Sequence, residues 1–194
     1  MVKQRIIEEA SELFGRSGVK SITMDDLARH LGISKRTIYE NFKDKENLLI
    51  ACIDALYEEA QRKKEKIFLA ADNMVKAILI MLQTGEQWQF NMINDIRKYY
   101  PLVYKEHLLR FHNDECRNME QTIRRGINEG FFRGDLNPEI IAHFFCRQGE
   151  NVDDKALNRF AFSDIIENIA ITFLRGICTA KGIEIIDKYK KTGK

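Results

Sequence analysis

Residues 23–49 read TMDDLARHLGISKRTIYENFKDKENLL, and this stretch decides the fold of the chain. Thr23 followed three residues later by Asp26 is a capping box, which lets a helix begin with its first amide groups satisfied. Gly32 predicts the end of that helix, because a residue without Cβ readily takes the left-handed conformation. Ser34 predicts the cap of a second helix. The stretch therefore predicts two short helices joined by a tight turn.

The second helix is expected to present two different faces. Ile38 and Phe42 are four residues apart, so both predict an inward face. The outward face then carries Lys35, Arg36, Tyr39 and Glu40. Asp44 predicts the cap of a third helix, and Lys45 at its start is placed to hold a phosphate. This pattern is typical of a helix-turn-helix that meets duplex DNA with its second helix.

The same residues resemble the N-terminal signature of the TetR family of bacterial repressors, T-x-x-(apolar)-A-x-x-x-G-(apolar)-S-K-x-T-(apolar)-Y-x-x-F-x-x-K-E-x-L. The resemblance covers roughly residues 4–50, about a quarter of the chain. It includes a preceding helix that Gly18 closes and whose inward residues are Ile6, Ile7, Ala10, Leu13 and Phe14. This chain has Arg36 where the family most often has a small residue, which adds a long cation to the reading face.

The resemblance implies which side chains meet DNA: Thr23, Ser34, Lys35, Arg36, Thr37, Tyr39 and Lys45. Lys35 and Arg36 are long enough to reach guanine in the major groove, and Thr37 can offer a hydroxyl or pack its methyl group on thymine. Tyr39 is expected on a phosphate, together with Thr23, Ser34 and Lys45. Three alternatives stay open: Tyr39 as a prop for the helix, Arg36 as a solvated charge, and Lys45 as a salt-bridge partner.

The composition of the chain is compatible with a DNA-binding protein but does not by itself indicate one. The chain has 194 residues, 44% of them hydrophobic, and a formal net charge of +2, so it is no polycation. Local placement of charge carries the case, because Lys35, Arg36, Lys43 and Lys45 cluster in and just after the second helix. No apolar run approaches the roughly 20 residues that a membrane span needs, and the N-terminus does not resemble a signal peptide. We expect a soluble, cytoplasmic protein with no membrane partner.

The rest of the chain also predicts helices, so the expected fold class is all-α. We expect a DNA-binding domain at residues 1–48 and a ligand-binding and dimerisation domain at 49–194, joined by a long helix from about Lys45 into residues 62–66. Further helices are predicted at about 70–84, 87–98, 102–129 (ended by Gly130), one capped by Asn137 with Pro138 first, and a last one at about 156–179, with a loop at 147–155.

The last predicted helix carries too many apolar residues for a single face, which indicates a partner surface. In TetR-like proteins the last two long helices pair with their copies as a four-helix bundle. The residues expected at such an interface are Ile140, Ile141, Phe144, Phe145, Ile166, Ile169, Ala170, Phe173 and Gly176. The alternative is that this helix is central in a monomer core. A homodimer would read a palindromic operator, with half-sites about 34–36 Å apart.

TetR-like proteins usually hold a small molecule inside the second domain, so the resemblance implies an effector, which the sequence does not identify. Candidate pocket residues are Trp88, Phe90, Met92, Tyr104, His107, Phe111, His112 and Phe144. Plain core is the alternative for these side chains, and a ligand-independent DNA-binding protein of the same fold is the alternative for the whole chain. Repression is the family default. Binding of the effector is expected to release the operator.

No further chemistry is expected. The sequence contains no nucleophile elbow, phosphate loop, H-E-x-x-H motif or paired catalytic carboxylates, so no enzyme, catalytic residue or cofactor is predicted. The four cysteines (Cys52, Cys116, Cys146 and Cys178) form no C-x-x-C pair and are expected to be ordinary buried thiols. A metal site of His112, Cys116, His143 and Cys146 is the weaker alternative, because a core histidine beside thiols explains the same residues.

Overall fold

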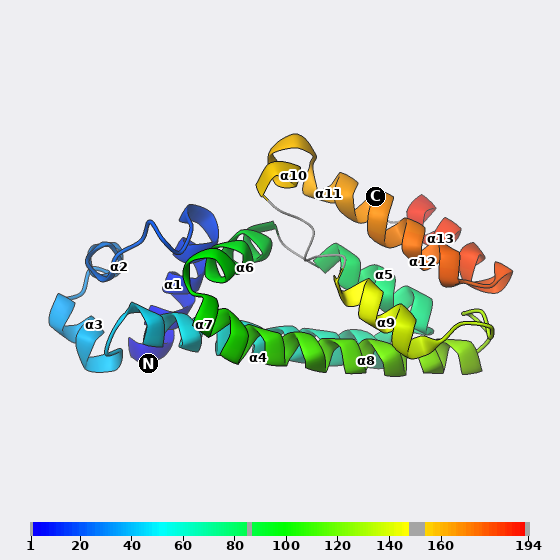
Figure 1. The fold of residues 1–194 in the computed structure, drawn as a ribbon, viewed down its shortest axis with the longest axis horizontal. Coiled ribbons are helices and arrows are strands. Elements are labelled where there is room, and N and C mark those ends of the chain that lie inside the picture. Colours follow the sequence, from blue (N-terminus) through cyan, green and yellow to red (C-terminus); the bar gives the residue numbers. More distant parts are fainter. Residues whose placement is uncertain (1, 85–86, 148–153, 193–194) are drawn as a thin grey trace. The chain divides into compact units, whose positions relative to one another are not determined.

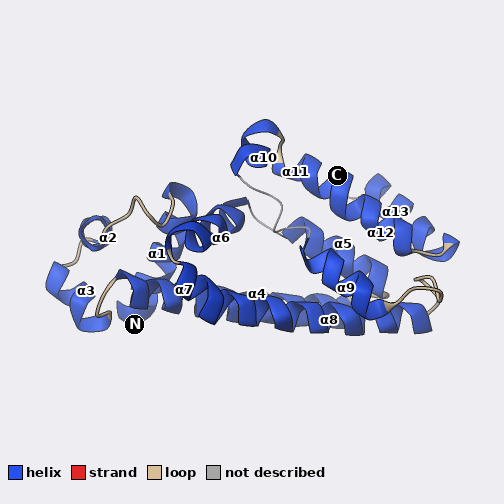
Figure 2. Ribbon diagram, in the orientation of Figure 1, coloured by secondary structure: helices blue, strands red, loops and turns tan. Residues whose placement is uncertain are grey.

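The computed structural model describes residues 2–84, 87–147 and 154–192. Within these ranges every regular element is a helix, apart from one isolated β-bridge (Figures 1 and 2). The prediction of an all-α fold is therefore confirmed. The chain forms two compact units. Residues 1–62 and 86–111 make up the first unit, and residues 63–85 and 112–194 make up the second.

The first unit joins the N-terminal helices to helices from the middle of the chain. Its elements are α1 (Val2–Ser17), α2 (Met24–Leu31), α3 (Lys35–Asn41), the first part of α4 (Lys45–Ala70), α6 (Gln87–Tyr99), α7 (Pro101–Val103), the π-helical turn η1 (Tyr104–Leu108) and the first residues of α8 (Leu109–Asn128). One core holds them together, in which Phe14, Leu27, Ile38, Leu48 and Ile96 are fully buried. The N-terminal helices, called the head below (residues 1–48), are therefore not held together by their own residues alone, because α6 from the middle of the chain packs along α1.

The second unit is also built from helices around one core. It contains the remaining parts of α4 and α8, together with α5 (Met74–Thr84), α9 (Pro138–Arg147), α10 (Asp154–Arg159), α11 (Phe162–Ile165), the π-helical η3 (Ile166–Ile171), α12 (Thr172–Ile177) and α13 (Ala180–Thr192). Met74, Ile78, Ile123, Leu174 and Ile186 are buried at its centre. α13 packs against α5. No helix in the described ranges has both the length and the apolar character that crossing a bilayer requires.

The end of α8 and the start of α9 were predicted correctly from local sequence signals. Gly130 ends α8 with φ of 76°, in the left-handed region that glycine tolerates best. Asn137 begins α9, since its Oδ1 accepts hydrogen bonds from the amides of Glu139 and Ile140 at 3.0 and 3.2 Å. Pro138 follows as the first helical residue, where its missing N–H costs nothing.

The predicted helix start at residue 70 is wrong. α4 continues to Ala70, and α5 begins only at Met74. The buried Asn73 fixes this start, because its Oδ1 accepts a hydrogen bond from the amide of Lys76 at 2.9 Å.

The single helix predicted over residues 156–179 is also wrong. α10 ends at Arg159 and α11 begins at Phe162, and nothing in the local sequence explains this break. At the far end Cys178 is extended, because it forms an antiparallel bridge with Phe132. The amide of Thr179 donates to Phe131 O at 2.9 Å, and the unpredicted helix α13 follows. Of the predicted loop at 147–155, residues 148–153 lie outside the described residues.

The compact units differ from the predicted domains. The first unit extends along α4 to Arg62 and takes in residues 86–111, whereas the predicted head ended at residue 48. It stays a prediction that residues 1–48 bind DNA and that residues 49–194 bind the ligand and form the dimer.

Gly126→Ala is expected to destabilise the second unit. A Cβ on Gly126 in α8 would lie 2.2 Å from the ring of Phe132, which is itself buried and held by the bridge to Cys178. The gain in helix propensity is about 1 kcal/mol. So close an approach places the overpacking cost at the upper end of its usual range, about 3 kcal/mol, so we expect a net loss of about 2 kcal/mol in the free energy of unfolding. Urea denaturation measures it. The control Gly134→Ala meets no atom within 4 Å and should stay within about 0.5 kcal/mol; equal stability of both variants would contradict the packing argument.

Candidate nucleic-acid interface

Hydrogen bonds at both ends fix the first helix of the motif. Thr23 Oγ1 accepts from the Asp26 amide at 3.1 Å, while Asp26 Oδ2 accepts from the Thr23 amide at 3.0 Å, so the predicted capping box is present. Gly32 ends α2 with φ of 65°, and its amide donates to Arg29 O at 3.3 Å. These contacts turn the chain within the three residues 32–34, so that α3 can begin at Lys35.

The second helix is held by its own cap and by two buried side chains. Ser34 Oγ accepts from the amide of Thr37 at 3.0 Å, and the two hydroxyls lie 2.8 Å apart. Ile38 and Phe42 are buried in the core of the first unit, as the spacing predicted. The opposite face is open to solvent, because Tyr39 is exposed and the Arg36 side chain is 87% exposed.

Both long cations of this face are paired with acids of the same head. Lys35 Nζ forms an ion pair with Asp25 of α2, and Arg36 Nε donates to Glu40 Oε1 at 2.8 Å. All four side chains are largely exposed, and exposed ion pairs contribute only about 0–1 kcal/mol. Either cation can therefore exchange its acid for another partner at small cost.

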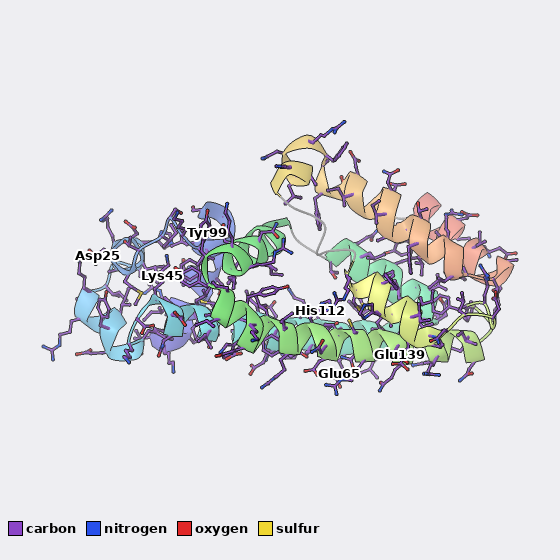
Figure 3. All side chains as sticks on the ribbon, in the orientation of Figure 1. Asp25, Lys45, Glu65, Tyr99, His112 and Glu139 are labelled. Atoms are coloured by element: carbon purple, nitrogen blue, oxygen red, sulfur yellow. The ribbon has the colours of Figure 1, made fainter. Side chains whose placement is uncertain are left out.

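Lys45, expected to bind a phosphate, is already surrounded by groups of the first unit (Figure 3). Its Nζ lies 3.5 Å from Lys20 O and within 6 Å of the ring centroids of Phe14 and Tyr100. Burial lowers the pKa of Lys45, and the carboxylate of Asp95 opposes that shift. These contacts join Lys45 to a backbone carbonyl and two aromatic rings, so its salt-bridge role and its phosphate role both stay predictions.

Asp95 of α6 is a residue of this region that the sequence did not indicate. Its Oδ2 accepts from the amide of Lys20 at 3.4 Å, and a Cβ at Gly18 would approach the same oxygen to 2.8 Å. Gly18 thus closes α1 with φ of 82° and also leaves room for the carboxylate. More than 70 residues separate Asp95 from Lys20, so no local pattern could have revealed the contact.

The candidate pocket residues are divided between the two units. Met92 and Phe111 are buried in the core of the first unit, where Phe111 stacks on Tyr57 with ring centroids 3.8 Å apart. Tyr104 packs against the same core, and His107 is half-buried in η1. His112 (Figure 3) and the exposed Phe144 belong to the second unit. The side chains of Trp88 and Phe90 lie outside the described part of the chain.

Most candidate interface residues that the structure describes are not deeply buried in the second unit. Ile140, Phe144 and Ile169 are 54%, 61% and 52% exposed, while Ile141 is half-buried and Gly176 is exposed. Phe145 and Phe173 pack edge to face, with centroids 5.4 Å apart. Ala170 is buried within its own chain, and the side chain of Ile166 lies outside the described residues.

The four candidate metal ligands do not assemble. Cys116 Sγ lies 3.5 Å from His112 Nε2 on the same helix, whereas His143 is exposed and packs against the ring of Phe144. Among the described residues, no group of three or more His, Cys, Asp or Glu side chains could hold a metal ion.

Comparison with known proteins identifies the family. The sequence model described as "Bacterial regulatory proteins, tetR family" matches residues 6–52. An HTH-type transcriptional regulator of Staphylococcus aureus is 48% identical over 137 residues, covering 62% of this chain and 70% of that protein. The chain belongs to the TetR family of bacterial regulatory proteins. YvaF, an uncharacterized HTH-type transcriptional regulator of Bacillus subtilis, is 26% identical over 182 residues, which cover 90% of this chain and 94% of YvaF.

The likeness to other TetR-family proteins extends to the whole fold. The regulatory protein TetR from Rhodobacter sphaeroides superposes with a TM-score of 0.76 at 18% identity, covering 90% of this chain and 97% of that one. The resemblance first recognised in residues 4–50 is thereby confirmed, and the protein is a helix-turn-helix, DNA-binding transcriptional regulator.

Thr23→Val is expected to weaken the head in a pH-dependent way. The Thr23 hydroxyl, which donates to Asp26 Oδ2 at 2.6 Å, is the main cause that lowers the pKa of Asp26, ahead of the Thr23 amide. A pKa lower in the folded state means that the ionised carboxylate favours folding. This contribution is complete above the ordinary pKa range of aspartate, and it is lost as the pH falls through the folded-state pKa. The variant should raise the pKa of Asp26 and flatten the loss of stability in acid.

Carboxyl NMR titration and urea unfolding at neutral and acid pH measure the two effects of Thr23→Val. Thr84→Val is a suitable control, because the Thr84 hydroxyl only donates back to Met81 O within α5. An unchanged pKa of Asp26 in Thr23→Val would show that the capping box is not its cause.

Proposed function

We propose that this TetR-family regulator is a cytoplasmic repressor that binds a palindromic operator as a homodimer and leaves it when a small molecule binds its second domain. The observation that carries the proposal is the solvent-facing side of α3, where Lys35, Arg36 and Tyr39 stand on a helix that Ile38 anchors in the core. A rigid support is what base reading requires, since a recognition helix must enter the major groove in a fixed register.

Lys35 and Arg36 are the proposed base readers. Each can donate to the O6 and N7 acceptors of guanine, and Thr37 can meet a neighbouring base edge or a thymine methyl group. Tyr39 extends from the same face and is proposed to donate its hydroxyl to a phosphate. Thr23 and Ser34 are proposed to bind phosphate as well, although both hydroxyls already serve as helix caps.

The acids paired with Lys35 and Arg36 are proposed to increase the sequence specificity of binding. Asp25 and Glu40 hold the two cations in the absence of DNA, so a guanine edge must compete with a carboxylate for each of them. A base that offers poor acceptors is disfavoured by this competition, by at most the roughly 0–1 kcal/mol that such an exposed pair contributes. Phosphates are also repelled by the acids, which weakens binding that depends on charge alone. Both effects favour sequence-specific over non-specific binding.

Exposed apolar side chains of the second unit support the proposed homodimer. Ile140 and Phe144 project from α9, and Ile169 from η3, and all three are more than half exposed in the single chain. Burial of a fully exposed side chain of this kind contributes about 1.5–3 kcal/mol, so covering the exposed half of each contributes about 1 kcal/mol, which favours a second copy that covers all three. Two identical heads related by a two-fold axis would then read the two halves of a palindrome.

The proposal that an effector releases the operator is supported by the family resemblance and by the path of α4 through the two units. α4 begins in the head and continues into the second unit, so a change in that unit can act on the head through the helix. A coupling of about 1–3 kcal/mol changes operator affinity 5- to 150-fold, and DNA must weaken effector binding by the same factor. Ligand-independent binding is the second candidate, because Met92 and Phe111, two proposed pocket residues, are packed in the core of the first unit.

Selection from random duplex DNA by the full-length protein is expected to return a palindrome. Lys35→Ala and Arg36→Ala should each relax base preference at one position of each half-site, with a loss of about 1–3 kcal/mol in operator binding. Arg16→Ala is the matched control, because Arg16 forms an equally exposed pair with Glu12, also four residues apart, on α1. Unaltered base preference in both α3 variants would refute their assignment, and selection of non-palindromic DNA would refute the two-fold arrangement.

Replacing Phe144 and Ile169 together by glutamate is expected to convert the dimer to a monomer, as measured by light scattering at micromolar concentration. Burying two unpaired carboxylates in an apolar interface costs several kcal/mol, more than a dimer of moderate affinity can supply. Leu69→Glu is the control, because Leu69 is exposed in the same unit but outside the proposed interface. A wild-type chain that is already monomeric would contradict the proposal outright.

A further inference from the structure

Two exposed lysines from different parts of the first unit lie at one aromatic ring. Tyr99 is the last residue of α6, and its ring centroid lies 4.6 Å from Lys20 Nζ and 5.1 Å from Lys98 Nζ. Lys20 belongs to the turn between α1 and α2, whereas Lys98 belongs to α6. Each ammonium group is attracted to the face of the ring. We call Lys20, Lys98 and Tyr99 the lysine–tyrosine patch.

A hydrogen bond holds the two parts of the patch together. Asp95 Oδ2 accepts from the amide of Lys20 at 3.4 Å, so the turn after α1 is tied to α6. Asp95 therefore meets the backbone of Lys20, while the side chains of Lys20 and Lys98 are exposed to solvent. Two like charges held close together repel each other, and an anion that binds between them relieves this repulsion.

The patch continues the surface on which the head is expected to bind phosphates. Lys45 Nζ lies 3.5 Å from Lys20 O, and Thr23, which caps α2, follows Lys20 by three residues. Three residues span at most about 11 Å of chain. Successive phosphates of one strand advance about 3.4 Å along the duplex axis. Lys20 is therefore within a few phosphates of a strand that contacts Thr23.

The chemistry of the patch suits a DNA backbone rather than the edge of a base. A lysine ammonium is a compact point charge, which binds phosphate oxygens without the fixed fork geometry of arginine. The two ammonium groups come from a turn and from the end of α6, so neither belongs to the helix that is proposed to enter the groove. Contacts of this kind add affinity and fix orientation, and they carry no sequence preference.

We propose that Lys20 and Lys98, gathered by Tyr99, bind the sugar-phosphate backbone of each operator half-site. This inference rests on the proposed function and extends the DNA-binding surface beyond the helix-turn-helix to α6. Tyr99 is a positioning residue, because its ring holds the two cations where the strand passes. Asp95 has the same kind of role through the backbone of Lys20.

The test measures the affinity of the full-length protein for the palindrome that it selects, by fluorescence anisotropy at about 50 to 200 mM salt. Lys20→Met and Lys98→Met each remove one charge and keep most of the side-chain stem. Each lost phosphate contact flattens the slope of log affinity against log salt by about 0.9, so a homodimer that loses two contacts should show a slope flatter by about 1.8. Over this range its affinity should fall about 12-fold less than that of the wild type. Base preference should stay unchanged.

Two controls separate the patch from the total charge of the protein. Lys105→Met removes an exposed lysine of η1 in the same unit and should leave the slope unchanged. Lys20→Arg keeps the charge and should keep the slope of the wild type. Equal flattening in Lys105→Met, or unchanged slopes in both patch variants, would overturn this inference and leave the proposed function in place. A wild-type protein that selects no palindrome would refute both.

Neutral phosphates locate the contact on the operator. Methylphosphonate groups, which carry no charge, replace the phosphates of each half-site one at a time. Positions that weaken binding of the wild type through the patch should lose their effect in Lys20→Met. Lys98→Met should act at the same or an adjacent phosphate, because both ammonium groups lie at one ring. If every neutral phosphate weakens both variants as much as the wild type, the patch does not contact the backbone.

Discussion

The constraint on which the head depends is the shortness of its two central helices. α2 has eight residues and α3 has seven, whereas isolated helices shorter than about 12–15 residues are marginal in water. Their stability comes from elsewhere: Leu27 and Ile38 are fully buried among side chains of α1, α4 and α6, and caps satisfy the amides at their N-termini. The reading face is therefore only as well placed as this core. Its outer residues are free to serve recognition because they contribute little to the fold.

The charged residues on the outer face of α3 also contribute little to the stability of the fold. Lys35 and Arg36 are paired with acids of the head, yet these pairs are exposed and weak, so they cost little to exchange. Lys45 differs, because it sits partly buried among Lys20 O and two aromatic rings and contributes to the interior of the first unit. Two lysines ten residues apart, Lys35 and Lys45, thus have different surroundings, the first exposed in an ion pair and the second partly buried. Sequence spacing alone cannot separate them.

The features that could be predicted from sequence are those with a local cause. Caps at Thr23, Ser34 and Asn137, and left-handed glycines at positions 32 and 130, depend on neighbours within four residues, and the structure contains all of them. The helix end at Cys178 could not be predicted, because it depends on a bridge to Phe132, more than 40 residues away. The pocket assignments rested on residue type alone, and aromatic side chains such as Phe111 serve equally well as core. At the candidate site, orientation was predictable from spacing, whereas electrostatic partners from other helices were not.

Asp95 shows what such a distant partner does. Its carboxylate accepts from the Lys20 amide in the turn after α1 and, by its charge, opposes the burial that lowers the pKa of Lys45 at the start of α4, so one side chain of α6 acts on both flanks of the helix-turn-helix. The approach is possible because Gly18 has no Cβ, which would otherwise come within 2.8 Å of the carboxylate oxygen. α6 also packs along α1 with the buried Ile96. Within the first unit, α6 therefore supports the helix-turn-helix as well as α4, and both helices can influence the placement of α3.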